Sequence, residues 1–234
     1  KNLGYGRAIN FAFNNVSTNF FLVLNPDLSI DVSSIENMLN TLNQYNDCGI
    51  VAPITLPDKD FYGAFPERNL KNVDSSNAIK SRELLLNSKI EGELCVDVAK
   101  GCALLISAKH FKNVGKFNEK YFLFWEEIDI CRKFRSKKTS VIVTPKSKAQ
   151  HNQGKSSKSN IQNFLIKTFH NEYSPFIYFN VQKFTIHHFK KITKYFFRGF
   201  SYLLILNIKK SVTNFIKLTA NIRYFFDLKT SSKK

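Results

Sequence analysis

The chain has 234 residues, with 35 Lys and Arg against 18 Asp and Glu, a formal net charge of +17. Its 43% hydrophobic and 23% charged content is ordinary for a globular protein, and its length suits one core with an appendage. The four cysteines show neither CxxC pairing nor metal-ligand spacing, and we expect no signal peptide. They predict reduced core residues in a cytosolic compartment.

The positive charge is concentrated at the C-terminal end. Residues 181–234 hold ten Lys and two Arg against one Asp, a net charge of +11. The same segment holds 11 of the 33 aromatic residues. This shift in composition predicts two parts, a domain over residues 1–180 and a basic tail over residues 181–234.

The first part alternates strands and helices. Gly4 and Gly6 predict a turn into a helix, and the apolar run 19–24 predicts a buried strand that leaves through Asn-Pro-Asp at 25–27. Ser33 and Glu36 have the spacing of a capping box before a helix, and 48–53 predicts another buried strand. A strand, helix and strand in this order predict a parallel α/β unit.

The middle of the chain predicts less regular structure. Residues 58–89 read as a long loop with a short helix at 81–86, followed by strands at 94–98 and 101–106. Ser107 is expected to cap a short helix that Gly115 closes. A strand at 140–145, a polar loop and a helix from residue 161 complete this part.

The acidic cluster at Glu126, Glu127 and Asp129 stands out in a basic chain. If a helix begins near Trp125, Glu126 and Asp129 share one face and Glu127 points about 100° away. Acids in a first helical turn are stabilised by the macrodipole by roughly 0.3–1 kcal/mol each, so a purely structural role is one alternative.

Five segments in order resemble the family 2 glycosyltransferases, and within them the bacterial rhamnosyltransferase-like members. They are GYGRAIN, FLVLNPD, VAKGCALLIS, VGKFNEKYFLFWEEIDICRKFR and the later His151. The resemblance covers about residues 1–157. It implies a GT-A-like nucleotide-sugar transferase fold with a mixed, mostly parallel sheet. It also implies that the first strand and helix of the nucleotide pocket are missing before Lys1, as in a fragment of a longer protein.

The resemblance also implies roles for individual residues. Asp27 and His151 would hold Mg²⁺ or Mn²⁺, hard ions that prefer oxygen ligands with some imidazole. Glu127 would be the catalytic base, at a position where the family carries aspartate, with Glu126 as the alternative. The remaining predicted contacts are Asn2, Gly4, Gly6, Arg7 and Asn25 to the donor, and Lys100, Gly101 and Trp125 to the acceptor.

The implied reaction is inverting transfer of a hexose, with rhamnose as the family's tendency, from a nucleotide-diphosphate donor to a glycan or lipid-linked acceptor. In the tail, Lys190, Lys194 and Arg198 form one helical face, and the longest uncharged run of ten residues is too short to span a bilayer. We expect a cytoplasmic protein at the anionic inner face of the plasma membrane. Alternatives are a helix packed on the domain, a non-catalytic sugar-binding relative and a nucleic-acid-binding protein, the last not favoured by any motif.

Overall fold

The computed structural model describes residues 2–56, 64–65, 92–151 and 160–231, which form two compact units. The sheet unit contains residues 6–118 and 126–156, and the helical unit contains residues 1–5, 119–125 and 157–234. The predicted boundary after residue 180 therefore falls inside the helical unit. The predicted helix at 81–86 and nearly all of the predicted loop at 58–89 lie outside the described residues.

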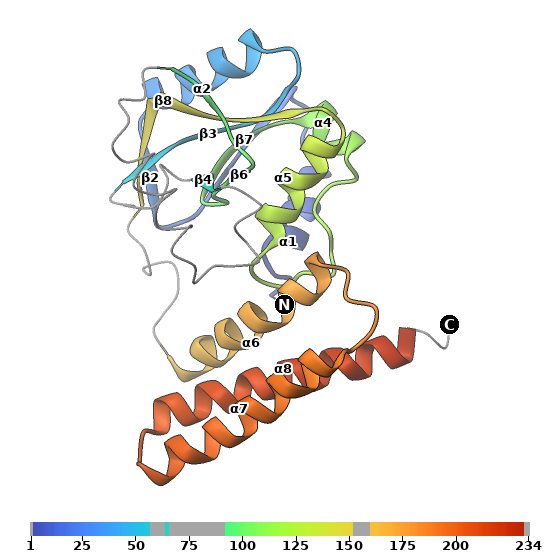
Figure 1. The fold of residues 1–234 in the computed structure, drawn as a ribbon. Helices are drawn as coiled ribbons and strands as arrows, with labels where there is room; N and C mark the ends of the chain where they lie inside the picture. Colours follow the sequence, from blue (N-terminus) through green and yellow to red (C-terminus); the bar gives the residue numbers. More distant parts are fainter. Residues whose placement is uncertain (1, 57–63, 66–91, 152–159, 232–234) are drawn as a thin grey trace. The chain divides into compact units, whose positions relative to one another are not determined.

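The sheet unit is built on one mixed sheet (Figure 1). Its strands lie in the order β1 (Phe20–Leu24), β7 (Ala103–Ser107), β3 (Cys48–Leu56), β8 (Ser140–His151) and β2 (Leu28–Ile30), with β5 (Leu94–Cys95) also paired to β8. A separate short pair joins β4 (Ala64–Phe65) to β6 (Val98–Ala99).

The predicted mixed sheet is confirmed, but its expected mostly parallel pairing is wrong. β1 and β3 run in the same direction, yet β7 lies between them and is antiparallel to both. Among the described strands, only β3 and β8 pair in parallel. The apolar run of β7 indicates burial on both faces, which all five of its residues have, but a local pattern carries no information on strand direction.

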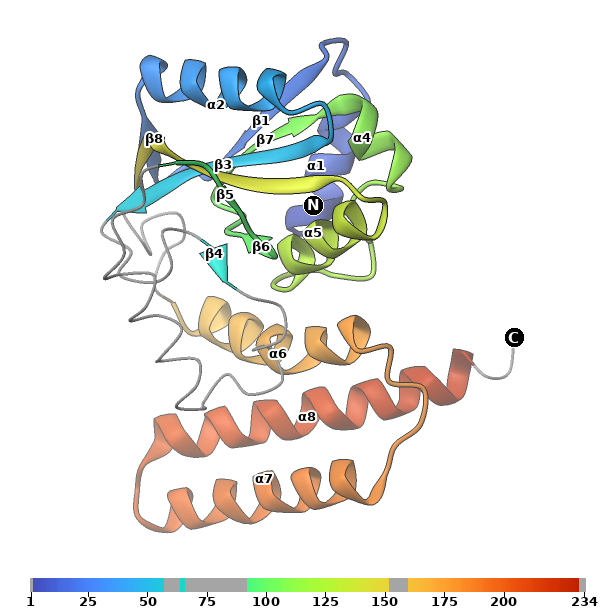
Figure 2. The same cartoon turned by 45° about the horizontal axis from the view of Figure 1, so that its top comes forward.

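Helices cover both faces of this sheet (Figure 2). On one face, α2 (Val32–Gln44) packs Met38 and Leu42 against Val51, Leu105 and Ile142 of β3, β7 and β8. Because side chains alternate along a strand, the neighbouring apolar positions of β3, β7 and β8 point to the opposite face. There α5 (Glu126–Ser136) packs against β6 and β8, so the core is divided into two layers by the sheet.

Two short helices complete the sheet unit at the ends of strands. α1 (Tyr5–Phe13) and α4 (Ala108–Asn113) meet through edge-to-face contact of the Phe13 and Phe111 rings, 4.8 Å apart. The predicted Ser107 cap is confirmed, since its hydroxyl accepts from the His110 N–H. For α2 the predicted capping box is wrong, because Asp31, two residues earlier, accepts from the Ser34 N–H at 2.6 Å.

The four cysteines are free, and Cys48, Cys102 and Cys131 are buried as expected. Cys95 differs from the expectation, because it is exposed on the short strand β5. Burial raises the pKa of the Cys48 and Cys131 thiols to about 12, so these two side chains behave as small apolar core residues.

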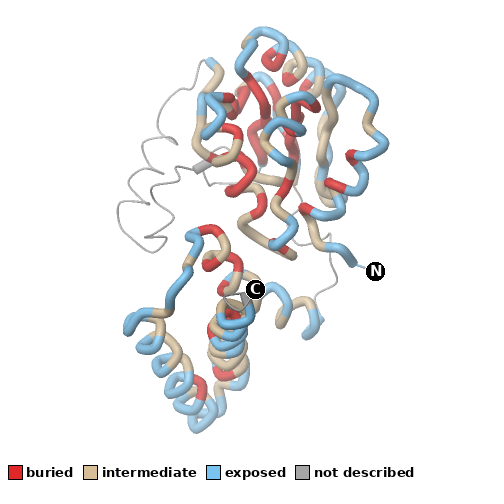
Figure 3. Tube along the Cα trace, turned by 90° about the vertical axis from the view of Figure 1, so that its right-hand side faces the viewer, coloured by how far each residue is buried: buried red, intermediate tan, exposed pale blue. Residues whose placement is uncertain are grey.

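The helical unit consists of α6 (Ile161–Tyr178), α7 (Ile186–Leu204) and α8 (Ile208–Ser231). Its polar centre is the buried Glu172 of α6, which pairs with Lys191 and accepts from Tyr195 on α7 and Asn221 on α8. Figure 3 shows that most of the strand residues are buried (red), whereas most of α7 is exposed (pale blue). Within the described part of the chain, no helix is both long and apolar enough to cross a bilayer.

Candidate active site

Asp27 and His151 meet at one edge of the sheet. Leu28 opens β2 directly opposite His151, the last residue of β8, so the ladder places Asp27 beside the imidazole. The His151 Nε2 lies 3.4 Å from the Asp27 Oδ1, and the Asp27 side chain is almost fully buried. The two residues that the sequence assigns to a metal are therefore neighbours in space, although 123 positions separate them along the chain.

The turn that carries Asn25 lies beside the turn that carries Lys100 and Gly101. The Asn25 N–H donates to the Cys102 carbonyl at 2.9 Å, and Leu24 pairs with Ala103 in the next rung. The exit of β1 and the entry of β7 thus form one joined pair of turns. This contact brings the predicted donor residue Asn25 close to the predicted acceptor turn within the sheet unit.

Glu127 belongs to a line of side chains on α5 that faces β6. The line continues at Cys131 and Arg135, since residues four apart stack on one helical face. The Arg135 Nε donates to the Asp97 carbonyl at 2.9 Å, and the Cys131 thiol receives the Ala99 N–H. Arg135 meets Asp97 and Cys131 meets Ala99, so four residues back along α5 correspond to two residues forward along the strand. By the same spacing we expect Glu127 to face the β6–β7 turn.

The surroundings of Glu127 favour its neutral form. Desolvation by burial raises the pKa of this carboxyl above its ordinary value, although part of its surface remains accessible. Glu126 is buried on another side of the helix. A carboxylate with a raised pKa holds a proton more readily than an ordinary one, which suits a general base that must accept a proton near neutral pH.

The start of α5 is anchored by a second set of charges. Asp129 is buried and pairs with Arg132 at 2.7 Å and with Lys133 at 3.6 Å. The Lys133 ammonium also donates to the Lys116 carbonyl at 3.0 Å. Lys133 therefore ties the helix to the loop before it. Sequence reasoning gave no role to Asp97, whose contact with Arg135 has no signal along the chain.

The glycines near the N-terminus are explained by close packing. A Cβ at Gly4, where φ is +82°, would overlap the Phe122 carbonyl, and a Cβ at Gly6 would lie 3.0 Å from the Phe117 Cβ. The Phe122 carbonyl also accepts the Tyr5 N–H, the first of α1, at 3.2 Å. The start of α1, near the predicted donor residues Gly4 and Gly6, is therefore partly covered by the protein itself.

The other two predicted donor residues here are exposed. The Asn2 side chain accepts from the Gly4 N–H at 2.9 Å, and Arg7 lies on the surface of α1. Gly6 and Arg7 belong to the sheet unit, whereas Asn2 and Gly4 belong to the helical unit. Their donor contacts stay predictions.

Trp125 immediately precedes the acidic pair and packs within the helical unit. Its ring lies 5.1 Å from Tyr178 and 5.6 Å from Phe179, measured between ring centroids. Both Phe124 and Trp125 have positive φ, at 64° and 72°, a conformation that costs roughly 1–2 kcal/mol for residues with a side chain. Strain of this kind is often kept where a site needs it. The predicted contact of Trp125 with the acceptor stays a prediction.

The Asp27–His151 pair fits a divalent cation. Two ligands in adjacent positions of an octahedral ion, each about 2.1 Å from it, lie about 3.0 Å apart. The observed 3.4 Å between the Oδ1 and Nε2 atoms is near this value. Among the residues that the structure describes, no group of three or more His, Cys, Asp and Glu could hold a metal. A cation here would take its other ligands from water and from a bound diphosphate.

Comparison with known proteins supports the family resemblance. Residues 1–106 match the model of the family described as glycosyl transferase family 2, which confirms the resemblance to that family and the GT-A-like α/β fold that it implies. The narrower resemblance to rhamnosyltransferase-like members stays a prediction. This match contains the Asn-Pro-Asp turn and the β6–β7 turn. The acidic pair and His151 lie beyond it.

One curated relative is the low-salt glycan biosynthesis hexosyltransferase Agl10 of Haloferax volcanii, 28% identical over 154 residues. The match covers 64% of this chain and 48% of the relative, so the chain spans about half the length of that protein. Among solved structures, GalNAc-T7 with UDP, GalNAc and Mn²⁺ is similar with a TM-score of 0.49 and 12% identity. This similarity covers 68% of this chain and 32% of that chain.

Proposed function

We propose that this chain, whose residues 1–106 match glycosyl transferase family 2, carries a catalytic site for transfer of a hexose from a nucleotide-diphosphate donor to a glycan. One observation carries the proposal. Asp27 and His151 meet at the sheet edge where the Asn25 turn joins the β6–β7 turn, and the Glu127 line of α5 leads to the same turn. The relative named above, a hexosyltransferase of glycan biosynthesis, supports the reaction class.

In this proposal the two parts of the site have separate tasks. Asp27 and His151 would hold a divalent cation, which would supply positive charge to the departing diphosphate. Glu127 takes the proton of the acceptor hydroxyl as its oxygen bonds to the anomeric carbon and the bond from that carbon to phosphate breaks. The nucleoside diphosphate leaves with the electron pair of that bond. Attack opposite to the leaving group inverts the anomeric configuration.

The finer details of the proposal come from the sequence. Rhamnose as the sugar, a lipid-linked acceptor and a role in cell-surface polysaccharide synthesis are supported by the motifs shared with rhamnosyltransferase-like enzymes. Action at the cytoplasmic face of the plasma membrane is supported by the net charge of +11 over residues 181–234.

The test is a donor screen with the purified protein. Nucleoside-diphosphate hexoses are incubated with Mn²⁺ or Mg²⁺ and acceptor glycans, and we expect release of nucleoside diphosphate together with a glycosidic product of inverted anomeric configuration. Replacing both Glu126 and Glu127 by Gln should abolish turnover and leave metal-dependent donor binding intact. The matched control is Glu36→Gln, which removes an exposed acid of α2.

Two results would contradict this assignment. Unchanged turnover in the double variant would show that the acidic pair is not catalytic. Donor binding without turnover on any acceptor, in the unaltered protein, would instead favour the non-catalytic alternative. Replacement of aspartate by Glu127 gives that alternative a specific basis, since a misplacement of about 1 Å can cost on the order of 10²-fold in rate.

A further inference from the structure

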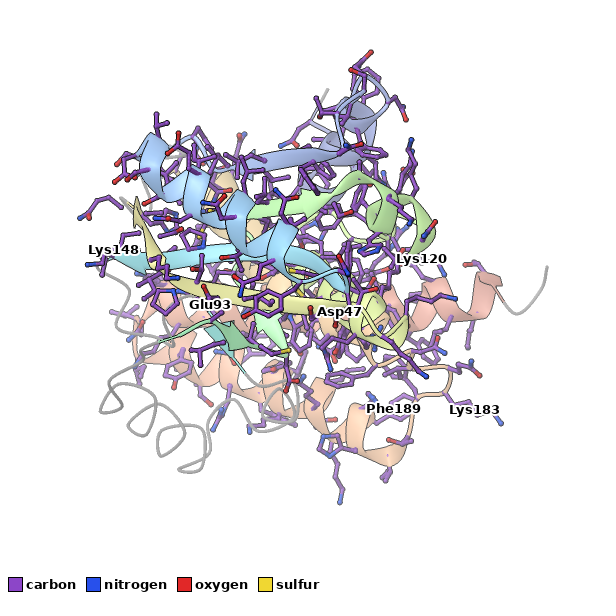
Figure 4. All side chains as sticks on the ribbon, turned by 90° about the horizontal axis from the view of Figure 1, so that it is seen from above. Asp47, Glu93, Lys120, Lys148, Lys183 and Phe189 are labelled. Carbon is purple, nitrogen blue, oxygen red and sulfur yellow. The ribbon has the colours of Figure 1, made fainter. Side chains whose placement is uncertain are left out.

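One side of α7 presents an apolar surface to solvent. We call it the α7 stripe, and it consists of Phe189, Phe196, Phe197, Phe200, Leu203 and Leu204. At 100° per residue these six positions fall within about 120° of arc around the helix. Every member is exposed, including Phe197 at 63% and Leu204 at 85% of its full surface. Figure 4 labels Phe189, the first of the six, near the start of α7.

The packing of α7 on α8 explains why the stripe faces outward. Gly199 lies on the other side of the helix, where an added Cβ would lie 2.8 Å from the Phe215 ring of α8. The Ser211 hydroxyl donates to the Gly199 carbonyl at 2.8 Å. This close approach fixes the rotation of α7 and turns the stripe mainly toward solvent. Two of its rings also reach α8, Phe200 at 5.3 Å from Phe215 and Phe189 at 6.0 Å from Phe225 between centroids, and both remain exposed.

The turn between the two helices extends the same surface. Leu206, at φ +55°, redirects the chain between α7 and α8. Ile205 is 68% exposed, Leu206 is 81% exposed and Ile208 is 54% exposed, so the turn adds three aliphatic side chains to the stripe. Exposed apolar surface of this extent on a soluble protein marks an interaction site.

Basic residues border this surface. Lys190, Lys194 and Arg198 lie at i, i+4 and i+8, which places them in one row along the edge of the stripe. Lys209 and Lys210 follow the turn. Between residues 186 and 210 the chain carries six Lys and Arg and no Asp or Glu. The partner of this surface should therefore be apolar at its centre and negatively charged around it.

We propose that the α7 stripe and the α7–α8 turn are inserted into the surface of an anionic lipid bilayer, with α7 lying in the plane of the headgroups. The aromatic and aliphatic side chains enter the acyl boundary, and the basic row contacts lipid phosphates. The turn, with the most exposed aliphatic residues, penetrates deepest. This inference gives the proposed function its membrane partner and contact surface, but it rests on the helical unit alone.

Charge argues against a second copy of the chain as the occupant. In a symmetric pair formed through the stripe, the basic row of one copy would lie near the basic row of the other. Like charges in such positions oppose association. A bilayer that contains phosphatidylglycerol supplies negative charge on all sides of an inserted helix. The basic row can then contact lipid phosphates while the α7 stripe enters the apolar region.

The experiment is co-sedimentation of the purified protein with liposomes of phosphatidylcholine alone or with 30 mol% phosphatidylglycerol. We expect binding to the anionic liposomes that weakens with added NaCl. Phe197→Asp with Leu204→Asp should lower the partition coefficient at least tenfold, whereas Phe11→Asp, an exposed phenylalanine of α1, should not. Lys190→Glu with Lys194→Glu should also lower it, while the matched pair Lys109→Glu with Lys137→Glu should have a smaller effect.

Three results would overturn the inference. They are equal binding to neutral and anionic liposomes, retained binding in the stripe variant, and concentration-dependent dimerisation that the stripe variant abolishes without any lipid binding. The last would assign the stripe to a second copy. Transfer to a soluble acceptor, measured on the same variants, separates the two proposals, because lost membrane binding with retained transfer leaves the enzyme assignment unaffected.

Discussion

Glu127 occupies a position where the protein favours the neutral carboxyl. Its folded-state pKa is raised by desolvation, so the folded protein binds this proton more tightly than the unfolded chain does. The tighter binding of this proton stabilises the folded protein in acid. That stabilisation is lost as the pH rises through the raised pKa of Glu127. At neutral pH the ionised side chain therefore opposes folding, which agrees with the proposed catalytic role of Glu127.

This linkage predicts the effect of Glu127→Gln on stability. The variant should unfold at a higher temperature than the unaltered protein at pH 7.5, because it removes an ionised carboxylate from a desolvated position. The difference should shrink as the pH falls below the ordinary carboxyl value of about 4.5, because the unfolded chain then binds this proton as well. The lower of the two pH values is 4. Calorimetry at the two pH values measures it. A lower midpoint at pH 7.5 would mean that the carboxylate is stabilising.

The same residue predicts the acid limb of the activity profile. A general base works only when deprotonated, so kcat/KM should fall tenfold per pH unit below the raised pKa of Glu127. We expect the midpoint of this fall in kcat/KM to lie above the ordinary carboxyl pKa of about 4.5. Steady-state rates between pH 4.5 and 8.5 measure it. A profile that stays flat to pH 4.5 would count against Glu127 as the base.

Asp27 and His151 predict a metal-binding phenotype. Asp27→Asn should weaken Mn²⁺ binding in the presence of nucleoside diphosphate by about 100-fold, the upper end of the range for groups that only orient metal ligands. His151→Ala should weaken it by at least about tenfold. Electron paramagnetic resonance of free Mn²⁺ reports the bound fraction. His187→Ala, in the helical unit, is the matched control, and equal loss in this variant would refute the site.

At the scale of elements, α5 is positioned by a glycine in the strand beneath it. The Phe134 ring of α5 lies against the backbone of β3 at Gly49, and a Cβ there would overlap both this ring and the Thr139 methyl group. The contact holds the helix that carries the acidic pair close to the sheet. A larger residue would have to move the buried ring or lift the helix.

Gly49→Ala should therefore lower the free energy of unfolding by about 1–3 kcal/mol, the usual range for an overpacked core. Activity should fall as well, because displacement of α5 moves Glu127. Urea unfolding together with donor turnover measures both effects. Gly92→Ala is the control, since nothing lies within 4 Å of the Cβ position there. If Gly49→Ala matched this control, the contact would not restrain α5.

Which elements could be predicted from the sequence depended on how local their signals are. β1, β3 and the start of α5 followed from short apolar runs and from acids at a helix start. The insertion of β7 between β1 and β3 could not be predicted, because strand order depends on contacts across the sheet. β8 extends to His151, past the predicted end at residue 145, since Ser147 and Ala149 alternate inward between exposed neighbours.

For the candidate site, too, local sequence motifs could be recognised, whereas contacts between distant segments could not. Asp27, His151 and the acidic pair could be predicted from motifs in order along the chain. The proximity of Asp27 to His151 required the Leu28–His151 pairing, and the direction in which Glu127 faces required the packing of α5 on β6. Neither contact is visible in the sequence. The packing of Gly4 against Phe122 was also hidden, because a glycine needed for close packing and one needed for a ligand look alike.

At the scale of the whole molecule, each unit has its own buried core. The helical unit depends on Glu172, because this one carboxylate connects α6 to both α7 and α8. Removing one partner of a buried ion pair typically costs about 3–5 kcal/mol. Units with separate cores can open separately.

Glu172→Ala should therefore accelerate amide hydrogen exchange throughout α6, α7 and α8 and leave β3, β7 and β8 protected. The increase expected is at least about 100-fold, which corresponds to roughly 3 kcal/mol. Mass-spectrometric exchange resolves the two sets of peptides. Loss of protection in the sheet strands as well would show that the two units unfold as one.

The single tryptophan of the chain, Trp125, can serve as an intrinsic fluorescent probe of the acidic pair and of α6. Trp125 is covalently next to Glu126, and its indole contacts the rings of Tyr178 and Phe179. Excitation of tyrosine can therefore pass to this one emitter, and its emission wavelength reports the hydration of a single known position. Arrival of a ligand at the acidic pair, or loosening of α6, can be followed by fluorescence in the unmodified protein.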